Sequence, residues 1–127
     1  MLSLYLRSGH RIHQLEYFMA VNEDYLNFIN DQLSGLGSYE TKPMFGGIGF
    51  FKEGLMFAML GKGVFRLKAD ELNKADFEER GIARFLSDKN TKGLPYYEVP
   101  AEILEDKDEL CIWAKRSFEA AQRKKKV

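Results

Sequence analysis

The stretch that decides the fold reads MFGGIGFFKEGLMFAMLGKGVFRLKA and covers residues 44–69. Apolar side chains recur in it at every second position, which is the period of a β-strand. Two glycine-containing turn signals divide the run, Glu53-Gly54 and Gly61-Lys62-Gly63. The strands that result cover about residues 44–52, 55–60 and 64–69. The stretch therefore predicts a three-stranded antiparallel meander.

The third strand of the meander alternates between apolar and basic side chains. Phe65 and Leu67 lie on one face, and Arg66 and Lys68 lie on the other. One face of the sheet is therefore predicted to be core, and the opposite face is predicted to be at least partly in contact with water.

The middle strand, in contrast, is apolar on both faces. Strict alternation sets Leu55, Phe57 and Met59 against Met56, Ala58 and Leu60. Both faces of this strand then need cover, either from helices or from another subunit. For this reason we expect the protein to form a homodimer.

Helices and further strands are predicted on both sides of the meander. Asn22 caps a helix over residues 23–36, and a short surface helix follows at residues 69–80. A core-facing helix begins near Asp106. Two more strands are predicted at residues 84–86 and 94–99, and the prolines that bound the second of them, Pro95 and Pro100, favour a place at the sheet edge.

These elements predict an α+β fold in two layers, in which an antiparallel sheet of about five strands packs against helices in the order α-β-β-β-α-β-β-α. Residues 19–127 form a single domain that ends in a basic tail, Arg123-Lys124-Lys125-Lys126. Residues 1–18 differ in character and are expected to be a leader outside the domain or an extended N-terminus that packs on it.

Composition excludes several classes of protein. The 127 residues are 45% hydrophobic and 30% charged, with 19 basic and 19 acidic side chains, so no overall field draws the protein to nucleic acid. Cys111 is the single cysteine, which favours a reducing compartment. No apolar stretch approaches the roughly 20 residues that span a bilayer. We therefore expect a cytoplasmic protein that does not bind membranes.

The sequence shows no constellation that demands catalysis. Outside residues 1–18 there is no histidine, and the carboxylate pairs Glu78-Glu79 and Glu105-Asp106 lie in charge-rich surface segments. Cys111 lies beside the apolar stripe of the last helix, as an inert buried thiol does. No catalytic residue, metal ligand or cofactor is assigned, and the protein is predicted not to be an enzyme.

The glycines of the first strand have two interpretations. Gly46, Gly47 and Gly49 could form a phosphate-binding loop, but such a loop leads from a strand into a helix, whereas here a strand follows. A β-bulge or close backbone packing explains them better. A shallow groove on this strand remains a candidate binding face, composed of Phe45, Gly46, Gly47, Gly49 and Phe51.

Basic side chains gather on or near the predicted hairpins. They are candidate nucleic-acid contacts: Lys42, Lys52, Lys62, Arg66 and Lys68. The alternative is that they are ordinary hairpin cations that discourage edge-to-edge association of sheets.

Several short motifs together resemble one family. They are KPMFGGIGFF at residues 42–51, GLMFA at 54–58, FRLK at 65–68, PYYEVP at 95–100, and Trp113 within 110–114. Over residues 21–122 the chain resembles the N-terminal domain of the TfoX/Sxy competence regulators, here expected to stand alone.

The resemblance implies a fold similar to that of type III secretion chaperones and a non-catalytic role in regulating transcription or competence. In some members that role involves the cyclic-AMP receptor protein, so a protein partner in transcription is expected and direct DNA contact is a weaker expectation. The alternative function is a chaperone-like module that binds a peptide or small ligand through the glycine-lined sheet face.

Overall fold

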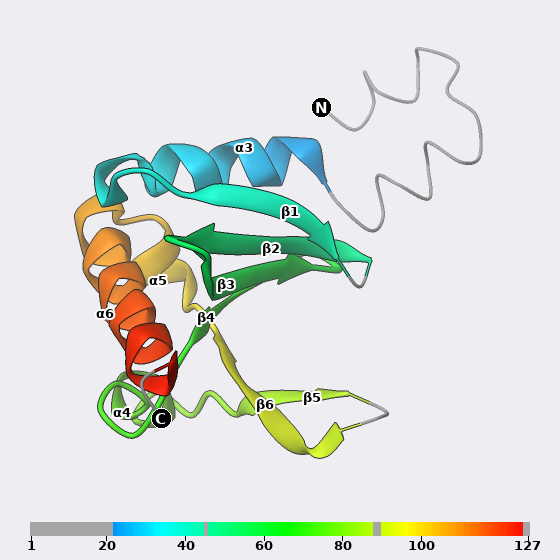
Figure 1. The fold of residues 1–127 in the computed structure, drawn as a ribbon, viewed down its shortest axis with the longest axis vertical. Helices are drawn as coiled ribbons and strands as arrows, with labels where there is room; N and C mark the ends of the chain where they lie inside the picture. Colours follow the sequence, from blue (N-terminus) through cyan, green and yellow to red (C-terminus); the bar gives the residue numbers. More distant parts are fainter. Residues whose placement is uncertain (1–21, 45, 88–89, 126–127) are drawn as a thin grey trace.

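A six-stranded antiparallel sheet forms the centre of the computed structural model, which describes residues 22–44, 46–87 and 90–125 (Figure 1). Its strand order is β1-β2-β3-β4-β6-β5. The strands are β1 (Glu40–Met44), β2 (Gly47–Lys52), β3 (Leu55–Gly61), β4 (Val64–Lys68), β5 (Arg84–Ser87) and β6 (Asn90–Glu98). The predicted α+β class with an antiparallel sheet is confirmed.

The helices gather on one side of this sheet. They are α3 (Glu23–Gln32), the 3₁₀ turn η1 (Ser34–Leu36), α4 (Ala75–Glu78), α5 (Ala101–Leu104) and α6 (Lys107–Lys125). The long helix α6 packs on β3 and β4 and also contacts α3, α5 and η1. Asn22 caps α3 as predicted, because its side-chain oxygen accepts a hydrogen bond from the Tyr25 amide at 3.1 Å.

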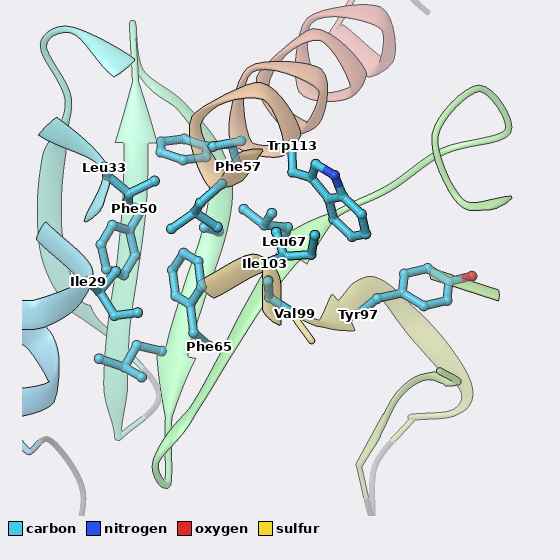
Figure 2. Close-up of a cluster of buried hydrophobic side chains, with 14 of the residues drawn as sticks. Ile29, Leu33, Phe50, Phe57, Phe65, Leu67, Tyr97, Val99, Ile103 and Trp113 are labelled. Carbon is cyan, nitrogen blue, oxygen red and sulfur yellow. The ribbon is translucent and has the colours of Figure 1, made fainter. Parts of the chain in front are cut away.

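One hydrophobic core fills the space between the helices and the sheet (Figure 2). Phe50 of β2 and Phe65 of β4 meet edge to face, with their ring centroids 5.3 Å apart. Ile29 and Leu33 of α3 and Trp113 of α6 belong to the same cluster. In the described part of the chain, α3, α4, α5 and α6 therefore all contribute apolar side chains to the core on the same face of the sheet.

Alternation along β4 is confirmed. Phe65 and Leu67 are buried in the core, whereas Arg66 and Lys68 are only partly covered. The opposite faces of one strand thus meet different environments, as the sequence pattern predicts.

Strict alternation along β3 is wrong at Phe57. The β2–β3 register shifts between Phe50 and Phe51, so that Phe50 pairs with Ala58 while Phe51 pairs with Met56. Phe57 is the extra residue of this β-bulge, and its ring contacts Phe50 on the core side. The bulge therefore moves Phe57 into the core beside Ala58 and leaves Met56 and Met59 on the other face.

The hairpin turns match the turn signals in the sequence. Glu53 and Gly54, and likewise Lys62 and Gly63, have positive φ angles between 52° and 80°. Two successive residues of this kind form the tight turn that suits the twist of a two-stranded hairpin. A third turn, which includes Gly46 at φ 75°, separates β2 from β1, a strand at residues 40–44 that the sequence pattern did not predict.

Two predicted helices are shorter in the structure. The helix expected at residues 23–36 ends at Gln32 and is followed by η1, and residues 69–80 contain only the single helical turn of α4. Asn73 explains the second difference. Its side chain accepts a hydrogen bond from the Asp70 amide and donates one to the Lys68 carbonyl, which favours a turn over a helix.

The expectation that residues 94–99 form an edge strand is wrong, because β6 lies between β4 and β5. Arg84 pairs with Tyr97 and the adjacent Phe85 pairs with Leu94, so two residues of β6 are skipped at this point. Pro95 is one of them. Its missing N–H therefore falls where the ladder is already interrupted.

No helix in the described part of the chain is long and apolar enough to cross a membrane. The predicted leader at residues 1–18 lies outside the described residues. The division at residue 19 therefore stays a prediction.

Candidate functional site

The second face of the sheet points away from the helices. Alternation and cross-strand register assign its side chains, because directly paired residues share a face. We call this surface the open face, and it comprises Glu40, Lys42, Met44, Gly47, Gly49, Phe51, Met56, Met59, Arg66, Lys68, Tyr96 and Glu98.

The centre of the open face is apolar and rich in methionine. Met44, Phe51, Met56 and Met59 are all partly exposed, and none belongs to the hydrophobic core. Methionine side chains adapt to irregular partners and recur on protein-binding surfaces. The large apolar residues that the described helices bury lie in the core on the other side, so among the described residues the helices do not cover this centre.

The glycines of β2 let other atoms approach closely. A Cβ atom on Gly47 would collide with the carbonyl oxygen of Leu60 on β3, which confirms the predicted close backbone packing. A Cβ atom on Gly49 would lie 2.5 Å from the Met44 sulfur and 2.9 Å from the Phe51 ring. The chain's own side chains therefore occupy the space above Gly49.

The predicted binding face is only partly assembled. Gly47, Gly49 and Phe51 lie together on the open face, whereas Gly46 is in the turn before β2. Phe45 lies outside the described residues. Its role as a binding residue stays a prediction.

Three of the five candidate nucleic-acid contacts share the open face, and each covers an aromatic ring. The Lys42 ammonium lies 5.0 Å from the centre of the Phe51 ring. The Arg66 guanidinium lies 4.1 Å from that of Phe85, and the Lys68 ammonium lies 5.1 Å from that of Tyr96. These contacts hold the cations against the sheet.

The other two candidates lie elsewhere. Lys52 points to the helical side, where its ammonium donates hydrogen bonds to the carbonyls of Ser38 at 3.0 Å and Leu36 at 3.4 Å and lies near the Phe118 ring. Lys62 is exposed in the β3–β4 turn. The five residues therefore do not form one basic patch.

Burial changes the acidity of groups on the open face. It lowers the pKa of Arg66 and of Lys68, and the charge of nearby Lys124 lowers the pKa of Lys68 further. Glu98 acts in the opposite direction on the pKa of Arg66. Burial raises the pKa of Tyr96 to about 12. A carboxylate brought close to these cations would offset their partial desolvation.

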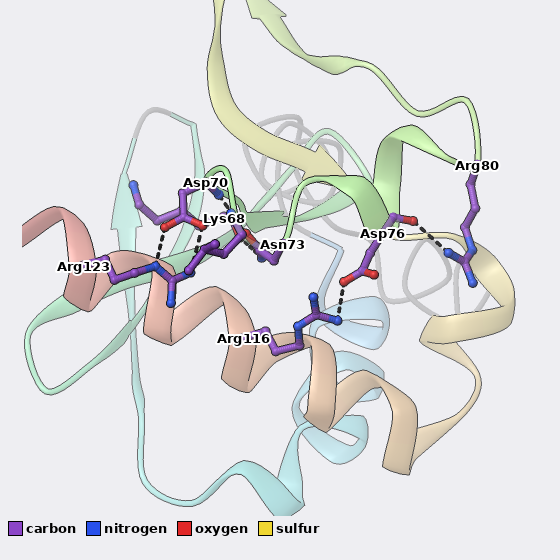
Figure 3. A network of polar contacts seen from close by, with 8 residues as sticks. Lys68, Asp70, Asn73, Asp76, Arg80, Arg116 and Arg123 are labelled. Atoms are coloured by element: carbon purple, nitrogen blue, oxygen red, sulfur yellow. Dashed lines mark hydrogen bonds and ion pairs between the residues drawn. The ribbon is translucent and has the colours of Figure 1, made fainter.

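A polar network ties the segment after β4 to α6 (Figure 3). Asp70 accepts two hydrogen bonds from the Arg123 guanidinium, at 2.6 and 2.8 Å, and Asp76 forms an ion pair with Arg116 at 2.5 Å. The hydrogen bond from Arg123 lowers the pKa of Asp70. These acidic side chains fix α6 in place against the end of β4.

Two titratable groups elsewhere have structural partners. Glu78 accepts a hydrogen bond from the Tyr97 hydroxyl at 2.9 Å, and the Cys111 thiol lies 3.4 Å from the Gln32 carbonyl oxygen. Within residues 22–44, 46–87 and 90–125, no three histidine, cysteine or acidic side chains gather where a metal ion could bind.

Sequence reasoning missed the surface as a whole. The pattern assigned Met56 and Met59 to opposite faces, because it could not foresee the bulge at Phe57. Alternation alone could have separated Lys52 from the other cations. Lys52 is two residues after the buried Phe50 on the same strand, so both side chains lie on the core face. That signal was available in the sequence.

Comparison with known proteins agrees with the motifs in the sequence. The family model described as the TfoX N-terminal domain matches residues 31–121. DNA transformation protein TfoX1 of Aliivibrio fischeri is 33% identical over 89 residues, a match that covers 68% of this chain and 40% of that protein. The chain thus spans less than half the length of this relative. It belongs to the TfoX N-terminal domain family.

Proposed function

We propose that the protein is a non-catalytic regulator of competence or transcription that acts in the cytoplasm through contacts made by the open face. Membership of the TfoX N-terminal domain family supports the regulatory role, and the similar protein of Aliivibrio fischeri is named for DNA transformation. A regulator of this kind works by binding another macromolecule.

The observation that carries the proposal is the difference in cover between the two sides of the sheet. Met44, Phe51, Met56 and Met59 form an apolar centre outside the hydrophobic core. Exposed apolar patches bordered by polar residues are typical of interaction sites. Charged side chains border this one, with Lys42 and Glu40 on β1 and Arg66 on β4.

The experiment is a complementation test in the bacterium that carries the gene. We expect deletion of the gene to change the abundance of a defined set of transcripts or the uptake of DNA, and the wild-type chain to restore it. Met59→Asp places a charge in the middle of the open face and should fail to restore the response.

Ile112→Asp is the matched control. Ile112 is an exposed apolar side chain on α6, 51% accessible, and lies away from the open face. This variant should restore the response in full. Deletion without any effect on transcripts or DNA uptake would contradict the regulatory role, and full activity of Met59→Asp would contradict the role of the open face.

A further inference from the structure

We propose that the open face packs against the open face of a second copy of this chain, around a two-fold axis that runs along β3. The inference rests on the proposed function, because it names what covers the same surface. Two features of the open face carry it: the order of its charges and the place of its methionines.

The register aligns one row of side chains across the sheet. Lys42 of β1 pairs with Gly49 of β2, Gly49 with Met59 of β3, Met59 with Arg66 of β4, and Arg66 with Glu98 of β6. The row therefore begins with a cation, ends with a carboxylate and has Met59 at its centre. Lys42 and Glu98 are both exposed.

This two-fold axis lies between the two faces and runs parallel to β3. Rotation about it reverses the order of the strands across the sheet, but each residue keeps its position along the strand direction. Met59 then meets Met59 of the second copy, and Lys42 lies opposite Glu98 of the second copy. Arg66 lies opposite Gly49 of the second copy, where its guanidinium would meet the Met44 and Phe51 side chains that lie above that glycine. Because the interface is isologous, each unlike pair occurs twice.

The charges select this axis over its alternative. A two-fold axis across the strands would set β1 on β1 and β4 on β4, so that Lys42 would face Lys42 and Arg66 would face Arg66. Like charges brought together in an interface are costly. The axis along β3 instead pairs opposite charges at both ends of the row.

A second row at the end of the sheet fits the same rotation. Glu40 pairs with Phe51, and Phe51 with Met56, on β1 to β3. Lys68 and Tyr96 pair on β4 and β6 at the same end. The rotation brings the Lys68 ammonium toward the Phe51 ring of the second copy, and the Tyr96 hydroxyl toward its Glu40 carboxylate. Cation–π contacts and hydrogen bonds are both available to these groups.

The remaining side chains suit a sheet-on-sheet interface. Met56 and Met59 lie on β3, near the axis, where their flexible side chains would meet their own copies. Sheets that pack face to face lie about 10 Å apart and cross at about 30°. Single-stranded nucleic acid fits less well, because Glu40 and Glu98 place carboxylates in the same two rows as the cations.

The test is a charge exchange followed by sedimentation velocity of the full chain, over a range of protein concentrations. Lys42→Glu and Glu98→Lys should each weaken the dimer about tenfold or more, since each sets two like pairs in the interface. The variant with both substitutions again pairs opposite charges, with the signs exchanged, and should regain most of the lost dimer affinity. Lys62→Glu changes the net charge as Lys42→Glu does but lies in a turn, and it should leave the dimer unchanged.

Other outcomes would overturn the inference. They are a wild-type protein that is monomeric at about 100 μM, single variants whose dimer is as strong as that of Lys62→Glu, or a double variant that regains none of the lost dimer affinity. Thermal unfolding of each variant separates loss of the dimer from loss of the fold. A monomeric wild type that still needs Met59 in the complementation test would reject the second copy and keep the proposed function.

Discussion

The two faces of the sheet are built from the same strands and have opposite properties. On the core face, Phe50, Phe65 and Leu67 are almost inaccessible to solvent, with exposures of 0–1%. On the open face, Met59 and Arg66, each adjacent in sequence to a core residue, stay partly exposed. One face therefore supplies the stability of the domain, while the other is free to supply its interactions.

The largest expected effect tests this division directly. Phe65→Ala should reduce the free energy of unfolding by about 3–5 kcal/mol, because it removes a fully buried ring and leaves a cavity. Met59→Ala should cost about 1 kcal/mol or less at low protein concentration. Urea unfolding at two protein concentrations measures both. Equal costs would remove the distinction between the faces.

The two glycines of β2 have different neighbours. Gly47→Ala should reduce the free energy of unfolding by about 1–3 kcal/mol, because its new methyl group meets the backbone of β3. Gly49→Ala should cost less, since the flexible Met44 side chain can move away. Thermal unfolding of the two variants checks the order. If Gly49→Ala proves the more damaging, the surface above β2 is more rigid than we propose.

Tyr96 lies on the open face and Tyr97 lies in the core, so one pH titration of stability tests both faces. Burial raises the pKa of each phenol from 10.0 to about 12, and a hydrogen bond to Glu78 contributes for Tyr97. Raised values in the folded state mean that these groups contribute stability below pH 10 and lose it as the pH rises toward 12.

We expect each of the two phenols to lower the free energy of unfolding by about 1–2 kcal/mol over this range. Denaturant unfolding at several pH values measures the loss. Tyr96→Phe and Tyr97→Phe should each reduce the slope of the free energy of unfolding against pH between pH 10 and 12. A slope that neither substitution changes would show that other groups dominate.

The smallest effect concerns the link between α6 and the end of β4. Asp70→Asn should reduce the free energy of unfolding by about 1 kcal/mol or less at neutral pH, because the ion pair with Arg123 is partly exposed. The lowered pKa of Asp70 means that the wild type loses this contribution as the pH falls below its ordinary value of 3.8. The two proteins should therefore converge in acid.

The control for this substitution is Glu71→Gln. Glu71 forms an exposed ion pair with Lys74, three residues along the chain. Its loss should have a smaller effect than that of Asp70→Asn at neutral pH. The opposite order would mean that Asp70 does not hold α6 to the end of β4.

Local patterns in the sequence predicted much of this fold. The turn signals at Glu53-Gly54 and Lys62-Gly63 depend on backbone angles of adjacent residues, and alternation along β4 depends on one strand alone. The bulge at Phe57 depends on how β2 and β3 pair, which periodicity within one strand does not contain. The open face therefore became visible only with the register.

The same limit explains the basic residues. Lys42, Lys52 and Lys68 look alike as hairpin cations, yet the backbone directs Lys52 to the carbonyls after α3 and the other two to the open face. Which cations share a surface is set by cross-strand pairing. Proximity along the chain does not determine it.

Oxidation of methionine measures the cover of the open face most directly. The rates at Met44, Met56 and Met59 can be followed by mass spectrometry while the wild-type protein is diluted through the micromolar range. A second copy on the open face predicts that all three rates rise together on dilution, and that Met59→Asp shows fast oxidation of Met44 and Met56 at every concentration. Rates that do not depend on concentration in the wild type would contradict the account.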